Sequence, residues 1–207
     1  MTEIENCRIS GSKHLITVLD LGEQDLTGVF PSSLEEPVTK GPLQLVWCPE
    51  SGLLQLRHSF DLGEMYGMNY GYRSGLNKSM VAHLESKIRN LTRKYPVASG
   101  DIVLDIGSND ATTLKSYSTQ GLKRIGIDPT GVKFREFYPA DIQLVPDFFT
   151  AAAFRSEFPS SKAQMITSIA MFYDLERPGD FVSDIRDVLA PDGVWHFEQS
   201  YMPSMLR

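Results

Sequence analysis

One short run, residues 102–111, constrains the fold more than any other part of the sequence. It reads IVLDIGSNDA: an apolar segment containing Asp105, then Gly107, then three small polar residues before a segment with helical character. A buried parallel strand that turns tightly into a helix has this pattern, and in open α/β sheets ligands bind outside the carboxyl ends of such strands. The run therefore predicts a ligand-binding turn, with a plain capped strand-to-helix turn as the alternative.

Strands and helices alternate after this run. We expect strands at 102–106, 124–128, 142–145, 164–169 and 194–198, with helices near 111–119, 131–137, 150–157 and 181–189. Such alternation implies a parallel sheet with right-handed crossovers. The predicted fold class is therefore α/β, with a Rossmann-like parallel sheet of five strands over residues 96–207.

The first part of the chain has a different texture. Residues 15–19, 43–47 and 53–58 read as short strands separated by long turns, which predicts a small β-rich module over residues 1–62. Residues 63–95 form a connector and a helix. Asn77 can cap this helix, and His83 within it is expected to be a surface or packing residue. The connector, rich in Gly, Tyr and Met, is either packed or a lid over a ligand.

Composition argues against several classes of function. The 207 residues carry 20 Lys and Arg against 26 Asp and Glu, a formal net charge of −6, and no basic block. Such a chain is a poor candidate for binding nucleic acid or anionic membranes. No apolar run is long enough to cross a membrane and the N-terminus lacks a signal segment, so we expect a cytoplasmic protein. Two cysteines are too few for a disulfide scaffold.

The turn after the first α/β strand lacks the glycine pattern of a dinucleotide site. That fingerprint is G-x-G-x-x-G, and Asn109 stands where the second glycine should admit a pyrophosphate. Gly107 leaves the backbone open to a ligand, while Ser108, Asn109 and Asp110 offer amides and side-chain oxygens. The pattern disfavours NAD and favours a ligand without a diphosphate.

Acidic residues stand at the ends of the first two strands of this sheet. Asp105 could orient an ammonium group directly or through water. Asp128, followed by Pro129, could accept hydrogen bonds from both hydroxyls of a ribose, although an aspartate before a proline is also common in turns. The conjunction of Asp105, Gly107 and Asp128 is more specific than any one of them.

The next two strand ends offer groups that suit an adenine. Asp147 could accept its exocyclic amine and Phe148 could stack on its ring, with a core role for Phe148 as the alternative. Small Ala170 would leave room for the ligand, and Met171 and Phe172 are either its neighbours or core residues. A ligand with ribose, adenine and an amino-acid end but no diphosphate is S-adenosylmethionine. The reaction would be methyl transfer, which needs a positioned methyl group and, for a carbon or oxygen acceptor, a base.

These motifs resemble the class I S-adenosylmethionine-dependent methyltransferases related to sugar C-methyltransferases. The resemblance rests on VLDIGSND at 103–110, GIDP at 126–129, MFYDLE at 171–176 and FEQSYM at 197–202. It implies that Tyr70, Tyr72 and Ser74 lie in a segment that closes over the cofactor, and that Tyr72 is a candidate to assist proton abstraction. It also implies C-methylation of a nucleotide-linked deoxysugar or a related small molecule.

The resemblance extends to the N-terminal module. The family carries a small zinc-binding domain with two Cys-x-x-Cys elements, and here these read Cys7-x-x-Ser10 and Cys48-x-x-Ser51. Because a structural zinc site takes four Cys or His ligands, we expect no metal in this zinc-ribbon-like module. The two cysteines could lie close together, but a disulfide is not expected in the cytoplasm.

The family also continues beyond the fifth strand into a His-Glu-His segment thought to carry the catalytic base. This sequence ends at Arg207, near that point. We therefore expect a truncated form, a fragment or the product of a degenerate gene, with the exposed edge strand as a possible site of homodimerisation. Two alternatives stay open: a module that binds S-adenosylmethionine without activity or as half of a split enzyme, and a nucleotide-dependent oxidoreductase, which Asn109 disfavours.

Overall fold

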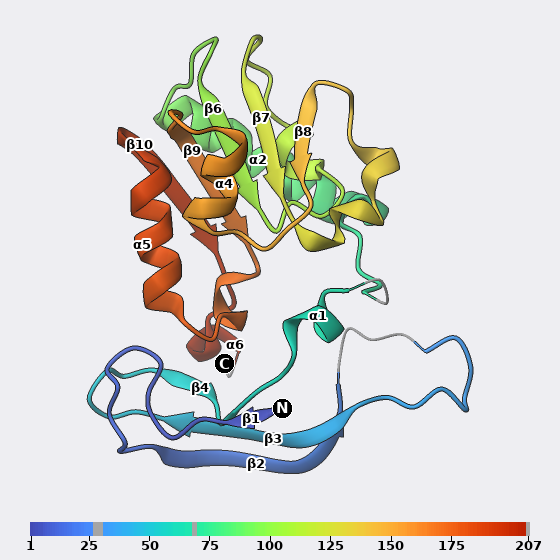
Figure 1. Cartoon of the computed structure of the whole chain (residues 1–207), viewed down its shortest axis with the longest axis vertical. Helices are drawn as coiled ribbons and strands as arrows, with labels where there is room; N and C mark the ends of the chain where they lie inside the picture. Colours follow the sequence, from blue (N-terminus) through green and yellow to red (C-terminus); the bar gives the residue numbers. More distant parts are fainter. Residues whose placement is uncertain (27–30, 68–69, 206–207) are drawn as a thin grey trace. The chain divides into compact units, whose positions relative to one another are not determined.

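The computed structural model describes residues 1–26, 31–67 and 70–205 (Figure 1). The chain divides into two compact units. The N-terminal unit comprises Met1–Tyr72 with Glu176–Gly179, and the α/β unit comprises Arg73–Leu175 with Asp180–Arg207. The three-part division predicted from the sequence, with boundaries after residues 62 and 95, stays a proposal.

The α/β unit is built on a five-stranded parallel sheet, which confirms the predicted fold class. Its strands are β6 (Ile102–Ile106), β7 (Lys123–Ile127), β8 (Ile142–Val145), β9 (Ala163–Ile169) and β10 (Leu189–Glu198). They lie in the order β10-β9-β6-β7-β8, and every pair is parallel. All five residues of the central strand β6 are buried, which explains its continuous apolar reading. The β9–β10 ladder is irregular between Leu189 and Val194, a segment that contains Pro191 and Gly193.

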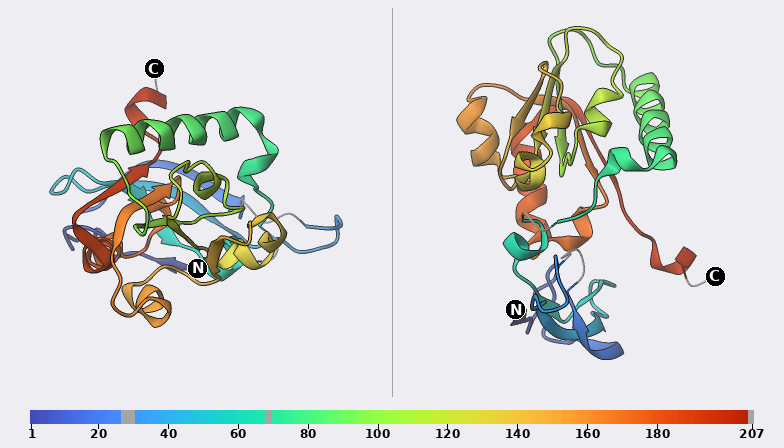
Figure 2. Two further views of the ribbon diagram at one scale, coloured as in Figure 1. Left: turned by 90° about the horizontal axis from the view of Figure 1, so that it is seen from above. Right: turned by 90° about the vertical axis from the view of Figure 1, so that its right-hand side faces the viewer.

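Helices cover both faces of this sheet. In Figure 2, α2 (Lys78–Lys94) lies on one face, and α4 (Ala151–Glu157) and α5 (Pro178–Val188) lie on the other. Helix α2 begins as expected, because the Asn77 side chain accepts a hydrogen bond from the Ser79 backbone N–H. Its buried residues Leu84 and Ile88 face the sheet side, where Ile88 packs in one core cluster with Val103. A second cluster joins α4 and α5 to the opposite face.

Two predicted helices of the α/β unit are wrong in length or type. Helix α3 spans only Thr112–Lys115, and the Ser116 hydroxyl donates to the Thr112 carbonyl, a side-chain bond that competes with helix continuation. The segment 131–137 forms two 3₁₀ turns, Pro129–Val132 and Arg135–Phe137. The carboxylate of Asp128 accepts from the backbone N–H of Thr130, a short-range cap that closes a tight turn in place of an α-helix.

The N-terminal unit is β-rich, as predicted, and has a thin core. Strands β2 (Ile16–Asp25), β3 (Lys40–Trp47) and β4 (Leu54–Leu56) form an antiparallel sheet in that order. Short strands β1 (Thr2–Glu3) and β5 (His58–Ser59) pair separately. The described part of this unit ends in a short helix, α1 (Leu62–Met65), and a further segment up to Tyr72. Its buried apolar side chains are few: Cys7, Leu26, Val46 and Cys48.

Over the described ranges, no helix combines the length and the apolar character that a membrane span requires.

Candidate functional site

Successive strands are added on one side of β6 and then on its other side, and this change of side locates the candidate site. From β6 the chain moves outward through β7 to β8, and then returns to the other side of β6 as β9. In open α/β sheets, ligands bind outside the carboxyl ends of the strands at such a change of side. The turns after β6, β7, β8 and β9 all lie at this end of the α/β unit. They carry most of the residues that the sequence singles out.

The turn after β6 has an unusual backbone. Gly107, Asn109 and Ala111 take positive φ values of 72°, 51° and 63°, in the left-handed region that glycine tolerates best. The Gly107 N–H donates to the Ile127 carbonyl at 2.9 Å, which ties the turn to β7. A Cβ atom at Gly107 would lie 3.4 Å from Cγ of Met171, so the turn after β9 approaches it closely. Non-glycine residues in this conformation cost about 1–3 kcal/mol each and concentrate at functional sites.

Asp105 lies at the end of β6 and is almost fully buried, with 2% of its surface exposed. Its carboxyl accepts a hydrogen bond from the hydroxyl of Thr167 on β9 at 2.5 Å, and Thr113 is a second hydrogen-bonding partner. Burial raises the pKa of Asp105 to about 7, with a smaller contribution from the charge of Asp128, against the opposing effect of its hydrogen bonds. The sequence predicts that Asp105 orients an ammonium group directly or through water, and this role stays a prediction.

Asp128 connects two turns. Its Oδ2 accepts from the Asn109 backbone N–H at 2.7 Å, and its Oδ1 accepts from the N–H and the hydroxyl of Thr130 at 2.7 and 2.6 Å. The residue is 5% exposed. A carboxylate oxygen can accept two hydrogen bonds, so Oδ2 has the chemistry to take a ligand hydroxyl as well. Pro129 begins the 3₁₀ turn that fixes Thr130 in place.

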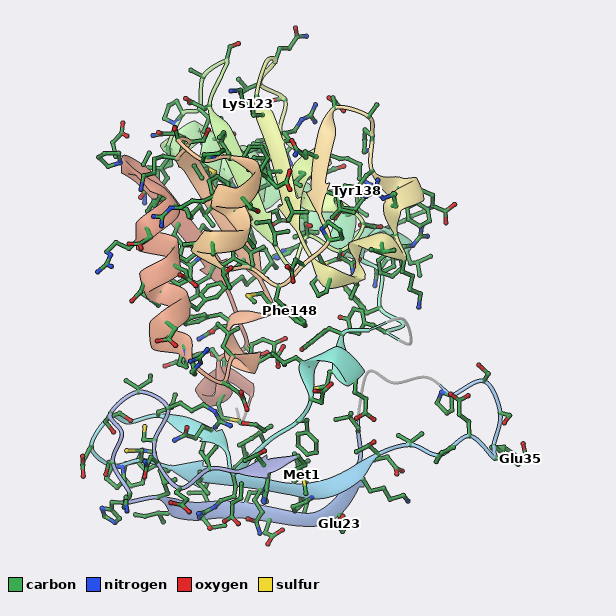
Figure 3. The ribbon with its side chains drawn as sticks, in the orientation of Figure 1. Met1, Glu23, Glu35, Lys123, Tyr138 and Phe148 are labelled. Atoms are coloured by element: carbon green, nitrogen blue, oxygen red, sulfur yellow. The ribbon has the colours of Figure 1, made fainter. Side chains whose placement is uncertain are left out.

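Ser108 is held inside the protein by an interaction that the sequence did not reveal. Its buried hydroxyl lies 2.8 Å from the hydroxyl of Tyr138, which donates to the Asn109 carbonyl at 3.0 Å (Tyr138 is labelled in Figure 3). Burial raises the pKa of Tyr138, so the phenol stays protonated and can donate. A Cβ atom at Gly126 of β7 would lie 2.4 Å from Oγ of Ser108. Gly126 lies in the middle of an apolar strand, and a glycine at such a position indicates in the sequence that another part of the chain approaches closely.

The side chains of Asn109 and Asp110 bind another part of the α/β unit. Asn109 accepts from the Ser74 N–H at 2.9 Å, and Oδ2 of Asp110 accepts from the Gly75 N–H at 3.0 Å. The guanidinium of Arg73 lies 4.0 Å from the same carboxylate. A Cβ atom at Gly75 would lie 2.4 Å from Asp110, so this approach needs a glycine. The sequence predicts Ser74 as a cofactor contact, and the structure brings its backbone to the turn.

The turn after β8 separates two neighbouring phenylalanines. Phe149 is buried and packs on Phe181 of α5 with ring centroids 5.3 Å apart. Phe148 is 41% exposed and lies at the carboxyl end of the sheet (Figure 3). The carboxylate of Asp147, also exposed, accepts from the Phe148 N–H at 2.7 Å. Phe148 is therefore accessible for stacking, while Phe149 belongs to the core.

The turn after β9 combines an exposed residue with packed ones. Ala170 is exposed, has a φ of 53°, and donates its N–H to the Glu198 carbonyl of β10 at 2.8 Å. Phe172 packs against Trp195 and Phe197, with ring centroids 5.4 Å from each. Met171 is half-buried against the same core. Of these three residues, Ala170 is exposed, whereas Met171 and Phe172 are half-buried. Contact of the three with a ligand stays a prediction.

Tyr70 and Tyr72 belong to the N-terminal unit, where their ring centroids lie 6.5 Å apart. Their contact with a cofactor, and the assisting role of Tyr72, stay predictions.

A charged cluster that the sequence does not predict lies at the end of β10. His83 on α2 lies 3.0 Å from Oε1 of Glu198, and Lys87 forms an ion pair with Oε2. Although partial burial opposes it, the hydrogen bonds and charges of Lys87 and His83 lower the pKa of Glu198 below its usual range. His83 and Lys87 meet Glu198 only because α2 lies close to the end of β10 in the folded protein. Glu198 lies 115 positions from His83 in the sequence, so no local sequence pattern predicts the cluster.

Comparisons with known proteins agree with this architecture. Residues 104–197 match a family model described as a methyltransferase domain, and residues 7–66 match one described as a putative zinc-binding domain. C-methyltransferase NovU of Streptomyces niveus is 23% identical over 208 residues, which cover 99% of this chain and 49% of NovU. The chain therefore spans about half the length of the curated relative that it matches.

Solved structures of other proteins also match part of this chain. The plantazolicin methyltransferase BpumL, crystallised with a triazolic analogue and SAH, has a TM-score of 0.48 at 14% identity, over 60% of this chain and 49% of that one. A chain from the complex between the Haloferax volcanii Trm112 activator and a putative methyltransferase has a TM-score of 0.46 at 21% identity, over 59% and 55%.

The sheet order, the turns at its carboxyl end and the family match over 104–197 define a Rossmann-like methyltransferase domain of class I. This is the class that the sequence motifs predict. Within it, the chain resembles the S-adenosylmethionine-dependent enzymes related to sugar C-methyltransferases, and the cofactor of the class is S-adenosylmethionine.

Proposed function

We propose that this protein transfers the methyl group of S-adenosylmethionine to a carbon atom of a small molecule, and that the acceptor is a nucleotide-linked sugar. The site at the carboxyl ends of β6, β7 and β8 carries the proposal, because a buried acid, a second acid and an exposed aromatic ring follow one another there. The likeness to NovU, which is named a C-methyltransferase, supports the choice of carbon. The net charge of −6 argues against a nucleic-acid acceptor.

In this proposal each strand end holds one part of the cofactor. Asp128 accepts one ribose hydroxyl through the remaining acceptor site of Oδ2, and Phe148 stacks on the adenine while Asp147 accepts its amine. Asp105 orients the ammonium group of the methionine part through water, beside the backbone of Gly107. The side chains of Ser108, Asn109 and Asp110 position the turn, since their hydrogen bonds run to Tyr138 and to the 73–75 segment.

Methylation at carbon requires removal of a proton from the acceptor. Tyr72 is the residue of this chain that we propose for that step. Because the chain spans about half of NovU, a second function is also favoured: a cofactor-binding module that needs further residues, from a longer chain or a partner, to activate the acceptor. Both functions predict the same cofactor binding, and only the first predicts methyl transfer by this chain alone.

Isothermal titration calorimetry with S-adenosylhomocysteine and with NAD tests the cofactor. We expect S-adenosylhomocysteine to bind and NAD to give no heat, because Asn109 occupies the position that a dinucleotide site needs as glycine. Tight NAD binding without S-adenosylhomocysteine binding would overturn the proposal. Incubation with labelled S-adenosylmethionine and a panel of nucleotide-linked sugars then separates the active enzyme from the module that binds only.

The variant Asp128→Asn tests the ribose contact. We expect its affinity for S-adenosylhomocysteine to fall by about 1–3 kcal/mol, or about 5- to 150-fold, because an amide has one acceptor oxygen where the carboxylate has two. Asp141→Asn is the matched control: this exposed acid pairs with Arg124 away from the strand ends that form the site and should leave affinity unchanged. Because Asp128 also holds Thr130, thermal melting of both variants checks that the turn stays folded. Equal affinity of the folded Asp128 variant and wild type rejects the contact.

A further inference from the structure

The N-terminal unit contains two loops of the same shape. The first begins at Cys7 and is closed by a hydrogen bond from the Gly11 N–H to the Cys7 carbonyl at 2.9 Å. The second begins at Cys48 and is closed in the same way by Gly52, at 2.8 Å. Both glycines have a φ of 72°. Both loops lie within residues 7–66, the part of the chain that matches the family model of a putative zinc-binding domain.

The third position after each cysteine is a serine, and the side chains of the two loops meet. Sγ of Cys7 lies 3.2 Å from Oγ of Ser51, and Oγ of Ser10 lies 3.5 Å from Sγ of Cys48. Both cysteines are buried. Each thiol is therefore paired with the hydroxyl of the opposite loop, and the two hydrogen bonds cross between the loops.

This donor set does not fit the metal that the family model implies. The model that matches residues 7–66 is that of a putative zinc-binding domain. Structural zinc takes four ligands from Cys and His, whereas two of the four positions here are hydroxyls. Among the residues that the structure describes, no group of three or more His, Cys, Asp or Glu could hold a metal ion.

We propose that this unit folds without a metal, and that the crossed hydrogen bonds among Cys7, Ser10, Cys48 and Ser51 replace zinc as the link between the two loops. The replacement satisfies the buried polar groups of the cluster. It is independent of the proposed methyl transfer, since none of these residues belongs to the α/β unit.

Arg8 adds hydrogen bonds that hold the first loop in place, because the crossed hydrogen bonds of the cluster are weaker than metal coordination. Arg8 follows the first cysteine, and its guanidinium donates to the Leu56 carbonyl at 2.8 Å and to the Ser59 hydroxyl at 2.9 Å. Its backbone N–H donates to the buried side chain of Gln55 at 3.2 Å. These hydrogen bonds connect the first loop to β4 and β5, so the position of the loop does not depend on the cluster alone.

The first test is metal content and its effect on stability. The full chain is purified without chelators, its zinc is measured by elemental analysis, and its melting is followed with and without EDTA. We expect no stoichiometric zinc and the same melting temperature in both conditions. One zinc per chain, or a fall in melting temperature with EDTA, would overturn the proposal.

The second test removes the hydroxyls. The double variant Ser10→Ala/Ser51→Ala should melt at a lower temperature than wild type, because each buried thiol loses its serine partner in the opposite loop. Ser32→Ala/Ser33→Ala, at two exposed serines of the same unit, is the control and should melt like wild type. If the Ser10/Ser51 variant melts no lower than this control, the hydrogen bonds do not link the loops.

The third test restores a complete ligand set. Ser10→Cys/Ser51→Cys should bind one Co²⁺ with the visible absorption of a tetrahedral thiolate site and should gain in melting temperature with Zn²⁺. Wild type and Ser32→Cys/Ser33→Cys should show neither change. A folded Ser10→Cys/Ser51→Cys variant that binds no cobalt would show that the loops lack the geometry of a former metal site.

Discussion

At the scale of single residues, burial decides what each acid of the site can do. The sequence places Asp105 and Asp128 at strand ends, and both are found there. It could not reveal that Asp105 would share a hydrogen bond with Thr167, 62 residues away, because that pairing depends on the register between β6 and β9. Nor could it reveal that the hydroxyl of Ser108 would lie within hydrogen-bond distance of the hydroxyl of Tyr138, 30 residues away.

Asp105 makes the stability of the protein depend on pH. Its pKa is about 7 in the folded protein, against about 4 for an unfolded aspartate, so the folded state binds the proton more tightly. Its contribution to the free energy of unfolding therefore falls as the pH rises from about 4 to about 7, and stays low above that. We expect the difference in free energy of unfolding between Asp105→Asn and wild type to increase in favour of the variant from pH 5 to pH 8. Urea unfolding at each pH measures this difference. A difference that is constant with pH would contradict this pKa.

The same shift predicts proton release when the cofactor binds. The ammonium group of S-adenosylhomocysteine favours the charged carboxylate of Asp105, so its arrival should lower the pKa of that carboxyl. We expect affinity to increase from pH 6 to pH 8, with release of about half a proton at pH 7, where about half of the free protein carries the Asp105 proton. Calorimetry in two buffers of different ionisation enthalpy measures that release. In Asp105→Asn the release should disappear, and its persistence there would assign it to another group.

At the scale of elements, strands were easier to predict than the segments between them. Strands β6 and β8 begin and end where the sequence places them, because each is a short apolar run bounded by polar residues. The segment 131–137 instead folds as 3₁₀ turns, since side-chain caps compete with the α-helix over so short a length. The attachment of residues 73–75 to the turn after β6 joins positions about 35 apart, which no periodicity reports.

Gly126 tests how tightly β7 and the turn after β6 fit together. An alanine there would place Cβ 2.4 Å from Oγ of Ser108 and 3.2 Å from the Tyr138 ring. We expect Gly126→Ala to lower the free energy of unfolding by about 1–3 kcal/mol and to weaken S-adenosylhomocysteine binding, since the turn must move. Gly179→Ala in α5 is the control: nothing lies within 4 Å of its Cβ, and alanine favours the helix. Equal free energies of unfolding for the two variants would show that the turn after β6 can move to accept the alanine without loss of stability.

At the scale of the whole molecule, the two units differ in how they are stabilised. The α/β unit has a fully buried central strand between two apolar clusters, whereas all ten residues of β2 in the N-terminal unit are exposed. The two family models divide the chain in a similar way, at 7–66 and 104–197. The sequence predicts both units, because short strands separated by turns fill the first part of the chain and strands alternate with helices in the second. It could not predict the four-residue cluster at Cys7 and Cys48, which needs two loops to meet.

Hydrogen exchange measured by mass spectrometry should resolve this difference and locate the cofactor. Amides of β6 should exchange most slowly and those of β2 fast, because local opening costs least where few apolar contacts are buried. Adding S-adenosylhomocysteine should slow exchange at the turns after β6 and β7, around residues 107–111 and 128–132. Exchange in β2 and β3 should be unchanged, which makes them the internal control. Protection confined to the N-terminal unit would place the binding site outside the carboxyl end of the parallel sheet and so contradict the site proposed for the cofactor.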